Sequence, residues 1–175
     1  MSAEQVTIRP ALAADVDAIT AIHAAARNAY YAAGGQPAPG SADSLRPAWA
    51  TAQSLAAPHA LICAEVAGRV VGLAAMNRSS IRPMQPAGSL FELHALHVDP
   101  QHWGCGVGDR MHTEFLQHLR RGGFNAGVLD VWDGNERARR FYQRRGWTFD
   151  GRSRPGPRDS QYLGMTLPAQ DAVIL

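Results

Sequence analysis

The feature that most limits how this chain can fold is a glycine-rich stretch between a strand pattern and a helix pattern. Leu90 to Val98 has the pattern of a strand closed by Asp99-Pro100, and apolar residues from Val107 to Leu119 recur at helical spacing. Between them stands Trp103-Gly104-Cys105-Gly106-Val107-Gly108. Glycine lets the main chain turn sharply, so successive N–H groups at the helix start can converge on one anion. We therefore expect a strand, a phosphate-binding loop and a helix in direct succession.

The rest of the sequence alternates short strand patterns with helix patterns, which predicts a fold of both element types. The expected elements before the loop are a strand at residues 6–8, a helix at 16–30, a weaker helix at 45–55 and a hairpin at 60–77 that turns at Ala67-Gly68. After the loop helix we expect a strand at 126–132, a helix at 135–145 and closing strands at 147–150 and 161–167. A chain of 175 residues has the length of a single domain, which we expect to span 1–175.

Composition and charge exclude several classes of partner. The chain is 46% apolar and 18% charged with a net charge of +2, which is the balance of a globular protein. Its arginines gather at residues 137–145 and 152–158, so we expect a local anionic ligand and no nucleic acid. No apolar run could span a bilayer and the first residues lack a signal-peptide pattern, so we expect no membrane partner and a cytoplasmic protein. Cys63 and Cys105 belong to no metal-binding pattern and are expected to be free thiols.

Three kinds of glycine loop can be compared with this one. A P-loop ends in Gly-Lys-Ser or Gly-Lys-Thr, which Gly108-Asp109-Arg110 does not supply. A dinucleotide-binding fold places its glycines after the first strand of the domain, whereas a hairpin precedes the loop here. A glycine-rich turn without a ligand is the third alternative, and the loop alone does not exclude it.

Three motifs occur together in an order and spacing typical of one family. They are Leu93-His94-Ala95-Leu96-His97-Val98-Asp99-Pro100, then Gly104-Cys105-Gly106-Val107-Gly108, then Asn135 to Ala138 with Phe141-Tyr142-Gln143-Arg144-Arg145-Gly146-Trp147. In these motifs the chain closely resembles the GNAT superfamily of N-acetyltransferases. The resemblance implies an α/β (α+β) fold with a central mixed, mostly antiparallel twisted sheet and helices on both faces. It also implies that acetyl-CoA is the cosubstrate and that an amine receives the acetyl group.

The same resemblance implies a cofactor site in three parts. The main chain of Leu96, His97 and Val98 would pair with the pantetheine arm, and the loop amides would hold the pyrophosphate. The loop residues concerned are Trp103, Gly104, Cys105, Gly106, Val107, Gly108 and Asp109, and the helix residues are Asn135, Ala138, Phe141, Tyr142 and Arg145. The family's loop usually opens with Gln or Arg where this chain has Trp103, so we expect the amides to carry the anion contact.

Structural roles compete with several of these cofactor contacts. Asn135 has the residue type of a helix N-cap. Ala138 and Phe141 share an apolar helix face with Tyr142, which fits core packing equally well. Arg144 and Arg145 both lie at the helix C-terminus, and either could reach a CoA phosphate.

Acyl transfer to an amine needs a base, because an alkyl ammonium with a pKa of about 10.4 is protonated at neutral pH. Glu92 is the first candidate, since the family places a base on this strand. Strand alternation puts Glu92 and His94 on one face unless a β-bulge intervenes, which makes His94 the reserve base. A solvated surface glutamate is the structural alternative for Glu92.

The remaining chemistry concerns the leaving thiolate and two features that resemble other sites. The resemblance makes Tyr142 the candidate acid, and a main-chain N–H near Leu96 would polarise the thioester carbonyl. Cys105, with His102 nearby, lies inside the presumed phosphate cradle, so we expect direct transfer rather than covalent catalysis. His94 and His97 are three apart on a strand and should point to opposite faces, so we expect no metal.

The acceptor is the least determined part of the sequence. We expect residues 30–49 and the loop 79–88 to wall its cleft, and the candidate lining residues are Tyr30, Tyr31, Arg46, Trp49 and Arg82. Core packing fits the tyrosines and the tryptophan equally well. A primary amine of a small molecule or peptide is the expected acceptor, and a homodimer is compatible with the sequence. Two other functions fit the same motifs: a catalytically silent CoA-binding or sensing module, and an acyltransferase that uses a longer acyl-CoA.

Overall fold

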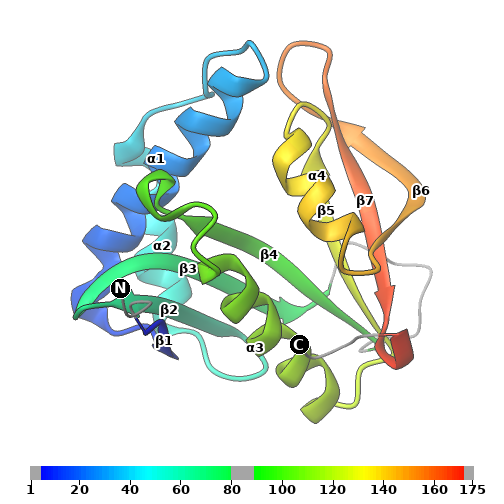
Figure 1. Cartoon of the computed structure of the whole chain (residues 1–175), viewed down its shortest axis with the longest axis horizontal. Coiled ribbons are helices and arrows are strands. Elements are labelled where there is room, and N and C mark those ends of the chain that lie inside the picture. Colours follow the sequence, from blue (N-terminus) through cyan, green and yellow to red (C-terminus); the bar gives the residue numbers. More distant parts are fainter. Residues whose placement is uncertain (1–4, 80–88, 172–175) are drawn as a thin grey trace.

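A computed structural model describes residues 5–79 and 89–171 of the chain. Within them, seven strands form one sheet in the order β1-β2-β3-β4-β5-β7-β6 (Figure 1). The strands are β1 (Thr7–Pro10), β2 (Ala60–Val66), β3 (Arg69–Arg78), β4 (Leu90–Val98), β5 (Ala126–Trp132), β6 (Thr148–Pro155) and β7 (Gln161–Pro168). The helices are α1 (Val16–Ala33), α2 (Arg46–Ser54), α3 (Val107–Arg121) and α4 (Glu136–Gln143). Neighbouring strands are antiparallel except β4 and β5, so the expected mixed, mostly antiparallel sheet is confirmed.

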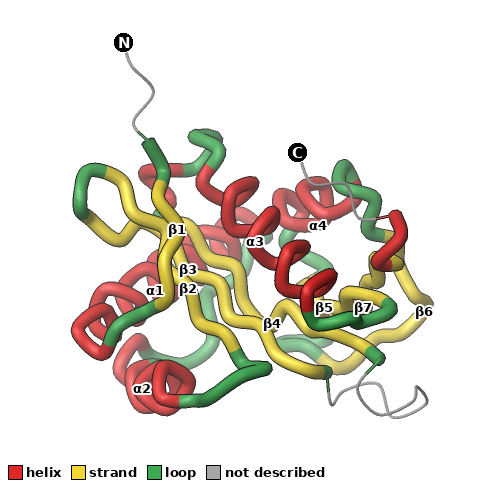
Figure 2. The backbone as a smooth tube through the Cα atoms, turned by 90° about the horizontal axis from the view of Figure 1, so that it is seen from below, coloured by secondary structure: helices red, strands yellow, loops and turns green. Residues whose placement is uncertain are grey.

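Helices cover both faces of the sheet, as Figure 2 shows. Successive residues of a strand point to opposite sides, so one apolar strand can pack against helices on both faces. In β2, Ile62 packs in a core cluster with Phe115 of α3. The preceding residue, Leu61, packs in a second cluster with Ile19 of α1. The helices α3 and α4 therefore lie on one face, and α1 and α2 lie on the other. No helix of the described segments is both long and apolar enough to cross a bilayer.

The last hairpin differs from its sequence-based prediction. The strand expected at 147–150 continues as β6 to Pro155 and pairs with β7 as far as Gln161. The register shifts between Phe149 and Ser153, so the strand contains an irregularity that interrupts the regular alternation. The segment Gly151-Arg152-Ser153-Arg154 has no apolar alternation of its own, and its extended conformation depends on the partner strand.

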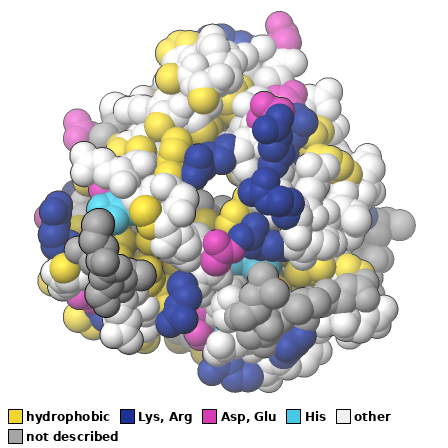
Figure 3. Space-filling view, in the orientation of Figure 1, with side chains coloured by type: hydrophobic (Ala, Val, Ile, Leu, Met, Phe, Trp, Pro, Cys, Tyr) yellow, Lys and Arg dark blue, Asp and Glu magenta, His cyan; other side chains and the backbone are white. Residues whose placement is uncertain are grey.

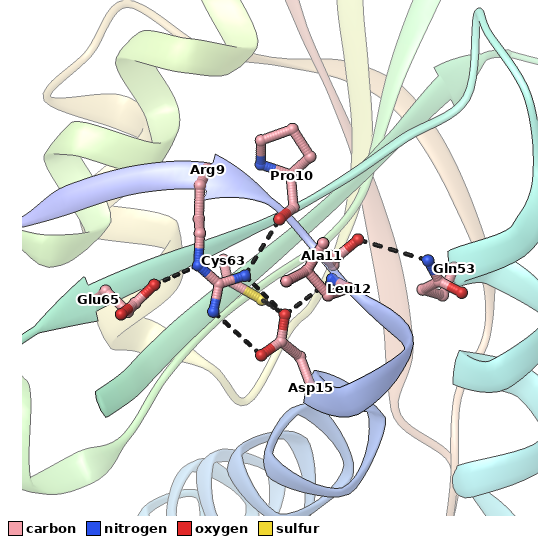
Figure 4. A network of polar contacts seen from close by, with 8 residues as sticks. All are labelled: Arg9, Pro10, Ala11, Leu12, Asp15, Gln53, Cys63 and Glu65. Carbon is pink, nitrogen blue, oxygen red and sulfur yellow. Dashed lines mark hydrogen bonds and ion pairs between the residues drawn. The ribbon is translucent and has the colours of Figure 1, made fainter. Parts of the chain in front are cut away.

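A polar network holds the first strand to the first helix (Figure 4). The guanidinium of Arg9 donates to both carboxylate oxygens of Asp15, at 2.6 and 3.0 Å, and also pairs with Glu65 of β2. The Leu12 main-chain N–H donates to the same Asp15 carboxylate at 2.7 Å. The hydrogen bonds from Arg9 hold the pKa of Asp15 below its ordinary value, so this carboxylate stays charged although the residue is only 8% exposed. The network fixes the direction in which α1 leaves the sheet.

A buried histidine should make the stability of this fold sensitive to acid. His112 of α3 is 4% exposed and accepts a hydrogen bond from Trp147 Nε1 at 2.9 Å. Burial lowers the pKa of His112 to about 4, below the value of about 6.5 in an unfolded chain. The unfolded state therefore takes up this proton first, and stability falls as the pH drops from about 6.5 to about 4.

We expect His112→Gln to lessen that loss, because glutamine stays neutral and can still accept a bond from Trp147. Urea unfolding at pH 7 and pH 4.5 measures the effect for both proteins. The fall in unfolding free energy between the two pH values should be smaller in the variant by roughly 2 kcal/mol. An equal fall in the two proteins would contradict the assignment of this proton to His112.

Candidate functional site

The site begins where two neighbouring strands separate. β4 and β5 pair only through Leu90 to Glu92 and Ala126 to Val128. Beyond Glu92, β4 continues beside β3 to Val98, and beyond Val128, β5 continues beside β7. The two strands diverge and leave an opening between them (Figure 1). Figure 3 shows the same face hollowed at its centre, with basic side chains gathered along the α4 side of the hollow.

The edge of β4 that faces this opening carries main-chain polar groups without a β5 partner. Asp99 N–H donates to Val71 O of β3 at 2.8 Å, so in an antiparallel pair His97 also directs its main-chain groups at β3. Leu96 and Val98, by alternation, direct theirs into the opening. Leu96, His97 and Val98 were expected to pair with a pantetheine arm through their main chain, and the register favours Leu96 and Val98 for this pairing. The main chain of His97 faces β3, and its side chain has a contact that is described below.

Trp103 has a role that the sequence did not indicate. Its indole Nε1 donates to Val98 O at 2.8 Å, and the Arg137 guanidinium lies 4.5 Å from the centre of its ring. The side chain thus fastens the loop to the end of β4 and to α4. The indole N–H is thus used by the Val98 carbonyl oxygen, one of the hydrogen-bond acceptors at the opening. Contacts to an anion are therefore left to the loop amides.

The glycine loop has the geometry of an anion cradle. Gly104 and Gly106 have φ values of 81° and 80°, a left-handed conformation that other residues adopt only with strain. A Cβ added to either residue would meet nothing within 4 Å, so both face open space. Gly106 caps α3, and the first N–H groups of a helix have no partner within it. These donors and the positive helix end favour an anion here.

Three further loop residues face α4, solvent or the core rather than the cradle itself. A Cβ on Gly108 would lie 3.3 Å from the Phe141 ring, so glycine allows α4 to approach closely. Cys105 is an exposed free thiol whose Sγ lies 3.8 Å from Trp103 O. Val107 is buried beneath the loop and belongs to the core of the α3 face.

α4 reaches the loop through its C-terminal end. Arg145 forms an ion pair with Asp109 of the first turn of α3, and its guanidinium lies 3.6 Å from the centre of the Phe141 ring. Its side chain is 15% exposed. Arg144 is exposed. Of the two arginines that the sequence left equivalent, the structure brings Arg145 to the loop.

Asn135 and the apolar face of α4 have structural contacts. The Asn135 side chain accepts a hydrogen bond from Ala138 N–H at 3.1 Å, so the expected N-cap is confirmed. Ala138 and Phe141 are partly buried against the core cluster of the α3 face. Tyr142 is 8% exposed in that cluster, with its ring 5.7 Å from that of Trp147. Burial raises the pKa of the Tyr142 phenol, so it remains protonated at neutral and moderately alkaline pH.

Glu92 is a buried carboxylate at the point where the strands separate. Its side chain is 8% exposed, and the Ser79 hydroxyl donates to Oε2 at 3.0 Å. His94 Nδ1 lies 3.1 Å from Oε1. The solvated surface position considered for Glu92 is therefore wrong. The core packing of Phe91 and Leu93 against the α3 face directs Glu92 toward the α1 side of the sheet.

A β-bulge corrects the expected alternation along β4. Leu93 pairs with Met76 and Ala95 with Ala75, which leaves His94 without a directly opposite residue on β3. The shared face expected for Glu92 and His94 from strict alternation therefore does not apply. The bulge nevertheless keeps the imidazole beside the carboxylate, and it also breaks the alternation from which His94 and His97 were assigned to opposite faces.

The residues expected to line the acceptor cleft lie in different environments. Tyr31 is fully buried and Trp49 is 8% exposed, so both belong to the interior and the expectation that they line a cleft is wrong. Arg46 is exposed in an ion pair at the surface. Tyr30 is half-buried beside Tyr31, and Arg82 lies outside the described residues together with loop positions 80–88.

An aromatic contact between α1 and β4 was not predicted. The imidazole of His23 stacks on that of His97 with 4.2 Å between ring centres, and His23 Nδ1 accepts a hydrogen bond from Trp49 Nε1 at 3.2 Å. Burial lowers the pKa of His23 to about 4 and that of His97 to about 3. Both rings are neutral at pH 7. The helical spacing of His23 gave no sign that its partner lies on a strand 74 positions later.

Comparisons with known proteins agree with this geometry. The chain resembles yncA of Salmonella typhimurium, solved with its cofactor acetyl-CoA, at 22% identity over 94% of each chain and a TM-score of 0.69. It resembles a GCN5-related N-acetyltransferase from Kribbella flavida at 22% identity over 93% of this chain and 97% of that one, with a TM-score of 0.70. PaiA N-acetyltransferase from Thermoplasma acidophilum, solved with coenzyme A, has 14% identity over 94% and 99% and a TM-score of 0.71.

No curated protein matches the chain in sequence. The family model described as the acetyltransferase (GNAT) family matches residues 20–147, which include most of α1, the diverging strands, the glycine loop and α4. The chain belongs to the acetyltransferase (GNAT) family.

Proposed function

We propose that the protein transfers the acetyl group of acetyl-CoA directly to a primary amine of a small molecule or peptide. The observation that carries this proposal is the arrangement of one opening: β4 and β5 separate at a buried carboxylate, Glu92, and a glycine cradle at the start of α3 follows the far end of β4. Acetyl-CoA supplies an acyl group activated as a thioester. An anion cradle and a buried base at the two ends of one opening are what such a donor and an amine acceptor require.

The residues proposed to hold acetyl-CoA come from three elements. The Leu96 carbonyl and the Val98 N–H face the opening and would pair with the amides of the pantetheine arm. The N–H groups of the loop, from Gly104 to Asp109, would bind the pyrophosphate, and Arg145 would add its charge. The ion pair between Arg145 and Asp109 holds that guanidinium at the loop before any phosphate binds.

The proposed chemistry assigns one task to each group at the root of the opening. Glu92 takes the proton of the acceptor amine, directly or through a water molecule, and Ser79 and His94 hold its two oxygens in place. The Leu96 N–H polarises the acyl carbonyl. Tyr142, kept protonated by its burial, gives a proton to the departing sulfur. His94 is the alternative base.

Tyr142→Phe tests the acid. The substitution removes only the hydroxyl, so the packing against Trp147 should persist. We expect kcat to fall by roughly 100-fold, the lower end of the range for general acid–base catalysis, with acetyl-CoA binding unchanged. Steady-state kinetics and calorimetric titration with acetyl-CoA measure the two quantities. Unchanged kcat would return Tyr142 to a packing role alone.

Two measurements on the purified protein test the function as a whole. Acetyl-CoA should raise the melting temperature, because a ligand that binds only the folded state stabilises it, and free CoA should compete for the same site. A panel of amines is then incubated with acetyl-CoA and the products are identified by mass. An increase of about 42 Da corresponds to one acetyl group in place of a hydrogen atom and supports acetyl transfer. Binding without any product would favour a silent CoA-binding module, and product formed only from longer acyl-CoA would identify a different donor.

A further inference from the structure

One face of α1 bridges the opening between β4 and β5. Residues four apart on a helix share a face, so His23, Arg27 and Tyr31 form one line along α1. At one end His23 stacks on His97 of β4. At the other end the Tyr31 hydroxyl hydrogen-bonds that of Tyr162 of β7 at 2.8 Å. By this spacing Arg27 lies midway between these two contacts, one of which is with β4 and the other with β7.

Among the described residues, Arg27 is a cation without a protein partner. Its Nε is buried and makes no hydrogen bond, and within residues 5–79 and 89–171 no carboxylate pairs with its guanidinium. Arg9, Arg145 and Arg154, in contrast, each pair with a carboxylate. A buried polar group that lacks a partner costs free energy, so its presence calls for an explanation.

The surroundings of Arg27 leave its charge uncompensated. Burial is the main cause that lowers the pKa values of His23 and His97, and the positive charge of Arg27 is a further cause. The guanidinium therefore lies near both rings. Both imidazoles are neutral at pH 7 and do not offset the charge. The half-buried Tyr30 ring lies on the same stretch of helix, and burial raises the pKa of its phenol, so it is neutral as well.

The position of Arg27 assigns it to the acceptor rather than to the donor phosphates. The phosphate cradle lies at the start of α3, and α3 packs on the opposite face of the sheet from α1. Glu92 is directed toward the α1 face. An acceptor whose amine reaches Glu92 therefore approaches from the side on which Arg27 stands. A guanidinium is a planar fork that binds a carboxylate through two parallel hydrogen bonds.

We propose that the acceptor is a small amino acid, in which the amine that is acetylated and a carboxylate belong to one molecule, and that Arg27 binds this carboxylate. The inference rests on the function proposed above and narrows its substrate class. Arg27 then sets specificity, because an acceptor that lacks the acid leaves the cation unpaired in the closed site.

The test compares α-, β- and γ-amino acids as substrates with their primary amides. Each amide has nearly the same size as its acid and no negative charge. Release of CoA and product mass give kcat and KM for each member. For at least one pair, kcat/KM of the acid should exceed that of the amide by about tenfold or more. Arg27→Gln should raise KM for that acid by about tenfold or more and change the rate with the amide by less than about threefold, and Arg27→Lys should restore part of the preference.

Matched controls separate this role from a structural one. Arg121→Gln changes an arginine that is exposed on α3 and paired with Glu114, and it should leave the acid preference intact. Arg27→Gln should keep the rise in melting temperature caused by acetyl-CoA. If the wild type acetylates amides as well as acids, or if Arg27→Gln slows both equally, the inference is wrong and the acetyltransferase function stands. If no amine is acetylated although acetyl-CoA binds, the proposed function fails and the inference fails with it.

Discussion

Glu92→Gln is expected to lower kcat by about 10²- to 10³-fold, the lower part of the range that a positioned general base contributes. Glutamine has the size of glutamate and can still accept the Ser79 hydroxyl bond, but it cannot take a proton from the amine. The limb of the kcat/KM pH profile that reports the base should disappear. Acetyl-CoA affinity should change by less than about twofold, because Glu92 lies apart from the proposed phosphate cradle.

Two companion variants make this result specific. Glu114→Gln removes a carboxylate of α3 that pairs with Arg121 at the surface, and it should leave kcat unchanged. His94→Asn removes the imidazole beside Glu92, and it should lower kcat less than Glu92→Gln if the histidine only positions the carboxylate. The opposite order, with His94→Asn the more severe change, would transfer the base to His94. Full activity in both variants would mean that water alone accepts the proton.

The parts of the fold that sequence predicted well are those with a strong local pattern. The bounds of β4 and β5 coincide with the expected strands, because each is rich in apolar residues and is closed by polar or turn residues. The glycine loop was located for a similar local reason: Gly104 and Gly106 adopt positive φ, which no other residue accepts as easily. The turn at Ala67-Gly68 also follows from its own two residues.

The details of the site depend on partners far away in the chain and could not be predicted. The bulge at His94 follows from the register between β3 and β4, which alternation within β4 does not encode. The hydrogen bond from Trp103 to Val98 O requires the loop to fold back on the end of its own strand. The burial of Tyr31 depends on Tyr162, which lies 131 residues later. In each case the local pattern offered two environments, and tertiary packing selected one.

The unpartnered Arg27 illustrates the same limit for function. In the sequence it is one of 17 basic residues and stands in an amphipathic helix, where arginine is common. Only the divergence of β4 and β5, together with the contacts of α1 on both sides of it, places this residue on the helix face that bridges the opening. Its importance is a property of the assembled site.

Gly106→Asp is expected to weaken acetyl-CoA binding by at least about 100-fold, because it adds a carboxylate to a cradle that is proposed to hold pyrophosphate. The new side chain would enter the open space that an added Cβ meets at this position. There it would compete for the free N–H groups at the start of α3. Asn and Asp tolerate positive φ better than other side chains, and both are favoured at a helix N-cap, so the fold should survive. Gly106→Asn adds the same shape without the charge and should weaken binding only about tenfold.

The control is a second glycine with the same backbone and no ligand. Gly68, in the turn between β2 and β3, has a φ of 76° and also faces open space. Gly68→Asp should therefore lower the melting temperature to a similar extent while leaving the calorimetric Kd for acetyl-CoA unchanged. Because the conformational cost is matched, the difference in Kd between the two aspartate variants reports the cradle alone. Wild-type affinity in Gly106→Asp would mean that the loop is a structural turn, and the donor site would then have to be sought elsewhere on the molecule.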